Sequence, residues 1–357
     1  MTAAARREHR LLHGPVLPVL ASLALPNILA MVAVTATSIA ETTYVGLLGR
    51  DQLAAMALVF PLAMLMQMFS AGAMGGGVSS AISRALGARD LEAAQSLARH
   101  AVAIALAAGA SFTLLFLVGG DALYRLLGAR GAVLEQAHRY ATVLFSGVSL
   151  VWLANTMISV VRGTGNMHVP SATILAVALL QITLGALFGL GWGPFPRWGM
   201  AGVALGQILA YGAACVWLGT YMCAPQRRVR LGRDGWQLTR SRFWQILRVG
   251  LLACLSPLQS VLTVLVVTGM IARMGVDALA GYGIGARLEF MAIPIAFGVG
   301  VATLPMVGMA VGNGNVPRAR RVAWVGGALS AAIVGAIGLL FTLWPQLWSR
   351  MFTDKTE

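Results

Sequence analysis

Glu41 is the only charged side chain between Val16 and Leu48, in a stretch of mostly apolar and small residues. If this stretch crosses a membrane, the carboxylate costs several kcal/mol, with estimates that start at about 2.5 kcal/mol. Such a group can bind a proton or a cation, because burial raises the pKa of a carboxyl and a nearby cation lowers it again. We therefore predict that Glu41 exchanges a proton for a cation. The alternative is that Glu41 lies near the outer end of its helix and reaches interfacial water.

Other polar side chains lie inside apolar stretches and are candidates for lining an internal cavity. Asn155 and Gln181 are uncharged, so hydrogen bonding between helices is the alternative explanation for both. Arg287 and Glu289 lie two residues apart and do not face each other on a helix, so each needs another partner or water. For these two, the alternative is a structural anchor near a membrane surface. Pro26, in LALPNIL, is either a static kink or a hinge.

The sequence contains no signature of an enzyme, a metal site or a nucleotide site. The motifs G-x-x-x-x-G-K-[ST], H-E-x-x-H and G-x-S-x-G are all missing. The three cysteines show no C-x-x-C spacing and are predicted to be packing residues. The net charge of +14 could indicate nucleic-acid binding, but the basic residues lie in short loops between apolar stretches. We therefore expect no nucleic-acid partner.

The elements that must position these side chains are membrane-spanning helices. The sequence contains 58% apolar and 11% charged residues, whereas a soluble domain carries about 25% charged residues. Runs of about 20 apolar residues fit helices better than the short alternating strands of a membrane barrel. We predict an all-α polytopic membrane protein. The nine predicted spans are 16–48, 53–82, 97–118, 140–161, 169–192, 200–223, 249–272, 278–311 and 322–343.

Lysine and arginine residues in the loops indicate the orientation of these spans. If the N-terminus is cytoplasmic, the loops on that side contain 17 of these residues, Arg162 among them, and the outer loops contain eight. We therefore predict that residues 1–15 form a cytoplasmic N-terminal segment.

The chain also repeats itself at an offset of 226 residues. Thr42–Ala55 aligns without gaps with Thr268–Gly281, and Gly, Asp, Leu and Ala recur at matching positions. Six spans separate the copies, so both have the same orientation, as in transporters built from parallel repeats. We predict an N-terminal six-helix lobe (16–223), a cytoplasmic linker (224–248) and the first half of a C-terminal lobe (249–357). Three more helices, for twelve in all, are expected to complete the repeat, so we expect a truncated chain.

The order of the motifs resembles that of the multidrug and toxic-compound extrusion (MATE) family. The first helix combines Glu41 with VGLLG at Val45–Gly49 and LAA at Leu53–Ala55. Further similar motifs are ALGARDLEAA (85–94), VRGTGN (161–166) with Pro170, WGMAGVALG (198–206), GYGIGARLEFMAIPIAFGVGVA (281–302) and VGNGNVPRARR (311–321). Each motif is weak alone, and their order and spacing make the combination specific.

The resemblance implies a two-lobe, twelve-helix antiporter that exports small organic, often cationic, compounds. A proton or sodium gradient drives export in the family, and no other cofactor is expected. The acidic residue of the first helix is commonly Asp in the family and is Glu41 here. One branch adds an Asn-x-x-x-Asp pair, which falls on Gln181 and Gly185, and a Thr that falls near Gly206. The second carboxylate of that branch is therefore missing.

The expected location is the cytoplasmic (inner) membrane of a bacterium, with membrane lipid as a partner and a monomer as the working unit. Two alternatives remain. A flippase for lipid-linked precursors shares the helical plan and would favour a larger basic cavity. A non-transporting membrane remnant or scaffold is the alternative from another functional class.

Overall fold

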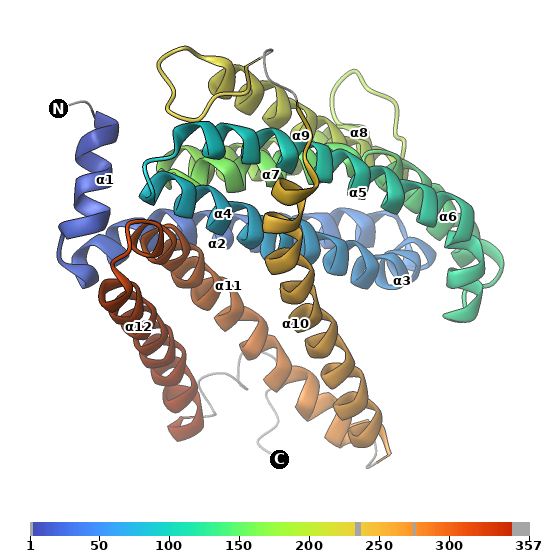
Figure 1. Ribbon diagram of the computed structural model, residues 1–357. Coiled ribbons are helices and arrows are strands. Elements are labelled where there is room, and N and C mark those ends of the chain that lie inside the picture. The colour runs from blue at the N-terminus through green and yellow to red at the C-terminus, as the bar shows by residue number, and fades with distance from the viewer. Residues whose placement is uncertain (1–2, 233–236, 274–275, 345–357) are drawn as a thin grey trace.

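The computed structural model describes residues 3–232, 237–273 and 276–344, without the side chains of 3–5, 265, 269, 272, 276–281 and 283–292. These ranges are helical and contain no strand. The helices shown in Figure 1 are α1 (Ala3–His13), α2 (Val16–Leu48), α3 (Arg50–Gln67), the π-helix η1 (Met68–Met74), α4 (Gly75–Gly87), α5 (Leu91–Leu126), α6 (Gly131–Ser146), α7 (Val148–Gly163), α8 (His168–Leu190), α9 (Met200–Cys223), α10 (Arg240–Ala272), α11 (Val276–Gly312) and α12 (Val316–Leu343).

Within these described ranges, eight helical segments are long and apolar enough to cross a membrane. One of them, Arg50–Gly87, combines α3, η1 and α4. The pair α6 and α7, bent by 45°, supplies a ninth span. The prediction of an all-α polytopic membrane protein with about nine spans is therefore confirmed. The bend falls at Gly147, between α6 and α7, whereas α2 is continuous through Pro26.

The helices also show the internal repeat. The spans α2, α3–α4 and α5 begin at Val16, Arg50 and Leu91, and α10, α11 and α12 begin at Arg240, Val276 and Val316. Each start in the second set follows its counterpart at close to the predicted offset of 226 residues. The parallel repeat is therefore present in the structure as well as in the sequence.

The predicted lobe and linker boundaries can be compared with where the helices begin and end. The six spans from α2 to α9 end at Cys223, where the N-terminal lobe is predicted to end. The predicted linker extends to residue 248, but α10 already begins at Arg240. Arginine is a good helix former, so a basic stretch such as Arg240–Arg248 continues a helix as readily as a loop. The assignment of these segments to independent lobes stays a prediction.

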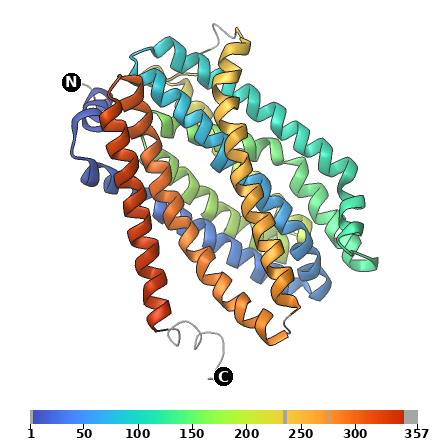
Figure 2. The same ribbon diagram turned by 60° about the horizontal axis from the view of Figure 1, so that its bottom comes forward.

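The second set of helices packs against the first mainly at one end of the molecule. Figures 1 and 2 show α10 and α11 crossing α4 and then leaving the main bundle toward their other ends. Glycines allow the backbones of α4 and α11 to touch. A Cβ atom on Gly87 would collide with the main chain of Met309, and one on Gly312 would collide with the Arg84 carbonyl oxygen. Small residues permit such close approach between membrane helices.

Candidate polar site inside the first six spans

Glu41 lies on the buried face of α2, with only 8% of the residue exposed. Its Oε1 atom accepts a hydrogen bond of 2.7 Å from Nε2 of Gln181 on α8, which is also buried. The helices α2 and α8 pack along each other, and this packing brings together two residues 140 positions apart. The structure therefore pairs two residues that the sequence marks separately as polar within apolar stretches.

Three tyrosines, Tyr44, Tyr140 and Tyr211, lie near enough to the Glu41 carboxylate to interact electrostatically with it. The three ion pairs among the described residues lie elsewhere, and none includes Glu41. A carboxylate that accepts an amide hydrogen bond but has no cationic side chain as partner is suited to binding a mobile proton or cation.

Helix packing explains one of the two glycines that depart from the family pattern. Gly206 on α9 packs so closely on α8 that a Cβ atom would lie 2.7 Å from the Gly185 amide nitrogen. A threonine at Gly206 would therefore force the two helices apart. Gly185 is buried on α8, but a Cβ atom there would make only ordinary contact with the ring of Tyr44, at 3.8 Å, so packing does not require a glycine at this position.

Asn155 belongs to a hydrogen-bond network next to this pair. Its Nδ2 atom donates to Ser70 Oγ at 2.9 Å and to Gln67 Oε1 at 3.3 Å. The Nε2 atom of Gln67 donates to the hydroxyl of Tyr211 at 3.1 Å. Tyr211 also interacts electrostatically with Glu41, so it lies between the Glu41–Gln181 pair and the hydrogen-bond network of Asn155. We call these residues the first-half polar cluster: Glu41, Gln181, Gln67, Ser70, Asn155 and Tyr211.

The π-helix η1 contributes Ser70 to the cluster. A π-turn leaves main-chain hydrogen bonds irregular and often occurs at functional sites. Sequence reasoning missed Ser70, Gln67 and Tyr211, because single neutral polar residues are common in apolar helices. Gln67, in MLMQMFS, is an uncharged polar residue within an apolar stretch, as Asn155 and Gln181 are, and could have been selected on the same basis.

Pro26 precedes a second buried polar group. Asn27 Oδ1 accepts hydrogen bonds from Arg162 Nη2 at 3.3 Å and from Ser171 Oγ at 3.5 Å. Arg162 is 3% exposed and lies in the last turn of α7, so the assignment of this residue to a loop is wrong. The predicted span ends at residue 161, whereas α7 continues to Gly163 and has its C-cap at Thr164. A hinge at Pro26 stays a prediction.

Arg287 and Glu289 lie on α11, but their side chains are outside the described residues. Their predicted place in the cavity therefore stays a prediction.

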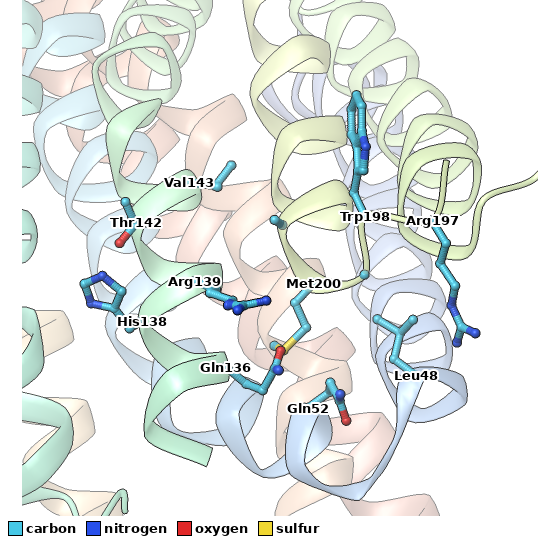
Figure 3. Close-up of a pocket in the computed structure, with 12 residues that line it drawn as sticks. Leu48, Gln52, Gln136, His138, Arg139, Thr142, Val143, Arg197, Trp198 and Met200 are labelled. Atoms are coloured by element: carbon cyan, nitrogen blue, oxygen red, sulfur yellow. The ribbon is translucent and has the colours of Figure 1, made fainter. Parts of the chain in front are cut away.

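A cavity of about 610 Å³ opens near the joined ends of α2 and α3, beside α6 and the start of α9. Figure 3 shows Arg139, Gln136 and Gln52 around it, with Met200 between α6 and the end of α2. Glu41, Gln181 and Asn155 are not among its lining residues. Leu48, which lines it, is seven residues from Glu41, or about 10 Å along the helix. The Glu41 carboxylate is therefore separate from this outer cavity.

Comparison with known proteins places this geometry in a family. A family model described as MatE matches residues 26–187 and 253–357, one match in each copy of the repeat. An FAD transporter of Shewanella oneidensis is 26% identical over 88% of this chain and 69% of that protein. A probable multidrug resistance protein NorM of Thermotoga maritima is 26% identical over 79% of this chain and 60% of that protein.

A solved structure gives the same result for the fold. It is the outward-facing conformation of a multidrug resistance MATE family transporter of the MOP superfamily. The TM-score is 0.88 at 26% identity, over 99% of this chain and 77% of the solved chain. Because the family model covers most of the sequence and the fold agrees, this chain belongs to the MatE family of membrane transporters and is not an enzyme.

Proposed function

We propose that this protein is a secondary transporter that exports small organic compounds in exchange for protons or sodium ions. The observation that carries the proposal is the buried Glu41 carboxylate, which accepts a hydrogen bond from Gln181 and forms no ion pair with a described side chain. Family membership and the relative named as a multidrug resistance protein support it. The working unit is a monomer in a bacterial cytoplasmic membrane, with a cytoplasmic N-terminus.

In this mechanism, ionised Glu41 holds a cation inside the first six spans, and protonation or ion exchange releases it. The cation is sodium or a cationic substrate. Rocking of the two sets of helices changes which side of the membrane the cavity faces. A one-for-one exchange of monovalent cations moves no net charge, so the concentration gradient of the proton or sodium ion drives it. Each net charge moved in any other ratio would add about 2.3 kcal/mol for each 100 mV of membrane potential.

A second candidate substrate class is a large organic anion. The similarity to an FAD transporter favours it, and so does the net charge of +14. Transport of a flavin dinucleotide, in place of a cationic dye, would assign this class. A flippase would instead move a lipid-linked precursor, and a scaffold would move none of these compounds.

The decisive experiment is transport in proteoliposomes with an imposed pH or sodium gradient. Movement of a fluorescent organic cation and of FAD would be compared for the parent protein, Glu41→Gln and Glu92→Gln. Glu92 is an exposed carboxylate in the first turn of α5 and serves as the matched control. We expect gradient-driven transport to fall at least tenfold in Glu41→Gln and to persist in Glu92→Gln. If Glu41→Gln transports as well as the parent, the role of Glu41 is refuted.

A further inference from the structure

A second, smaller cavity lies where α1 meets the start of α12, away from the first-half polar cluster. Figure 2 shows α1 beside this end of α12. The cavity has a volume of about 330 Å³, and none of its described lining residues is acidic. The lining residues are Leu12, His13, Asn315, Pro317, Arg318 and Arg321. Its chemistry therefore favours an anionic occupant.

Arg318 is held in a fixed orientation in this cavity. Its Nε and Nη2 atoms donate to the Leu11 carbonyl oxygen at 3.2 and 2.8 Å, and Nη2 donates to the Gly14 carbonyl oxygen at 2.8 Å. A guanidinium group has five N–H donors in a rigid fork. The two donors on Nη1 make no hydrogen bond within the described part of the chain. They remain for an acceptor from outside the protein.

Arg321 adds a second positive charge to the same cavity. It follows Arg318 by three residues on α12, so both side chains lie on one face of the helix, and their charges repel each other. The ion pairs among the described residues do not involve either arginine. A phosphate group between them would offset this repulsion, and arginine binds phosphate oxygens with strong charge-assisted hydrogen bonds.

The cavity adjoins the beginnings of two candidate spans, at Val16 and Val316, and the ends of such spans are where a membrane surface is expected. Trp324 follows Arg321 by three residues and is 73% exposed, so an aromatic side chain lies next to the basic pair on the outside of α12. Tryptophan is enriched at the headgroup level, and basic pockets between spans on the cytoplasmic side bind anionic headgroups.

We propose that this cavity binds the phosphate of an anionic phospholipid headgroup through Arg318 and Arg321, with His13 beside it. Because Arg318 also holds the end of α1, a bound headgroup ties α1 to α12 and so connects the first and second sets of helices. The lipid is then a structural ligand at the end of the molecule where the two sets of helices pack against each other. This inference does not depend on the transported substrate.

The test is lipid binding by the purified full chain in detergent, measured by native mass spectrometry during titration with phosphatidylglycerol. Arg321→Gln is the test variant, because Arg321 is exposed and makes no hydrogen bond that maintains the fold. Arg320→Gln is the matched control, since it removes the same charge from the neighbouring position outside the cavity. We expect about tenfold weaker binding in Arg321→Gln, a loss typical of one charge-assisted bond, and parent-like binding in Arg320→Gln. Arg321→Lys should recover part of the loss.

Two further ligands identify the source of the phosphate. Phosphatidylcholine, whose headgroup is zwitterionic, should bind more weakly than phosphatidylglycerol and should not respond to Arg321→Gln. Inorganic phosphate should compete only at far higher concentration, because it lacks the acyl chains that the membrane face holds. Equal weakening by the two glutamine variants overturns the site. Equal affinity for inorganic phosphate and phosphatidylglycerol overturns the lipid as its ligand.

Discussion

At the scale of single residues, the hydrogen bond between Gln181 and Glu41 determines how the carboxylate behaves. A hydrogen bond to a charged group contributes about 1.5–3 kcal/mol, and a buried charge without its donor is costly. The amide of Gln181 stabilises the ionised carboxylate without neutralising it. Under the proposed mechanism, this arrangement leaves the charge of Glu41 available to the transported ion.

Replacement of Gln181 by Leu should weaken cation binding at Glu41 and strengthen proton binding, while leaving the fold intact. The apolar side chain has a similar volume but removes the donor, so the ionised form of Glu41 becomes less favourable. We expect the sodium concentration that gives half-maximal transport to rise by about tenfold or, in a proton-driven protein, the corresponding proton concentration to fall by about tenfold. Gln207→Leu, which replaces a partly buried glutamine of α9, is the control. An unchanged ion dependence in Gln181→Leu would show that this hydrogen bond has no role in coupling.

The sequence identified part of this site because charge and polarity are unusual in apolar stretches. Glu41, Gln181 and Asn155 were recognisable on that basis. The structure pairs Glu41 with Gln181 and joins Asn155 to Ser70 by hydrogen bonds, and their role in transport stays a prediction. Their partners were not recognisable. Gln67 and Tyr211 are 144 residues apart, and only the packing of helices brings such residues together. Arg162 was wrongly assigned to a loop because a charged residue at the end of an apolar stretch was taken to lie outside the helix, whereas it is buried in the last turn of α7.

At the scale of helices, the contact between α4 and α11 holds together the end of the molecule where the two sets of helices pack against each other. Gly87 and Gly312 permit main-chain contact, and any added side chain must move one helix. Gly77, in the small-residue stretch Ala71–Ser80 (AGAMGGGVSS), permits a contact of the same kind. A Cβ atom on Gly77 would lie 3.0 Å from the Gly250 amide nitrogen of α10.

Gly312→Ala should therefore destabilise the protein. Alanine normally stabilises a helix by roughly 0.5–1 kcal/mol relative to glycine, but here the methyl group would collide with the Arg84 carbonyl oxygen. Overpacking of this kind costs about 1–3 kcal/mol, so the melting temperature in detergent should fall. Gly327→Ala on α12, where a Cβ atom meets nothing within 4 Å, should raise it slightly. A Gly312→Ala protein as stable as the parent would contradict the close contact.

Helix existence was predictable from apolar length, but local irregularities were not. The nine spans follow from composition and periodicity. The π-turn at Met68–Met74 and the bend at Gly147 depend on what packs beside the chain, and glycines near both positions merely permit them.

At the scale of the whole molecule, α1 fastens the two sets of helices together. The Glu8 carboxylate pairs with Arg228, which follows α9, and Arg318 of α12 holds the Leu11 and Gly14 carbonyl oxygens. Leu11 is fully buried, and it touches Gly165 in the connection between α7 and α8. No feature of the sequence predicted this fastening, because residues 1–15 contain no apolar run long enough to attract attention.

Arg318→Gln should release α1 from α12. The variant loses three hydrogen bonds to carbonyl oxygens, so α1 should detach and unwind more often, which frees the main chain at the exposed Arg10 for a protease. We expect trypsin to cleave after Arg10 about tenfold faster than in the parent. Arg320→Gln should be cleaved at the parental rate. Equal cleavage rates in Arg318→Gln and the parent would mean that other contacts hold α1 in place.

The π-turn has a counterpart in the second copy of the repeat. At the offset of 226 residues, Met68 corresponds to Pro294, which lies inside α11 and cannot donate a main-chain hydrogen bond. The first copy interrupts the α-helical hydrogen-bond pattern with a π-turn, and the second copy interrupts it with a proline, which lacks a main-chain N–H. The two copies of the repeat therefore depart from the regular α-helical hydrogen-bond pattern at corresponding positions, by different chemistry.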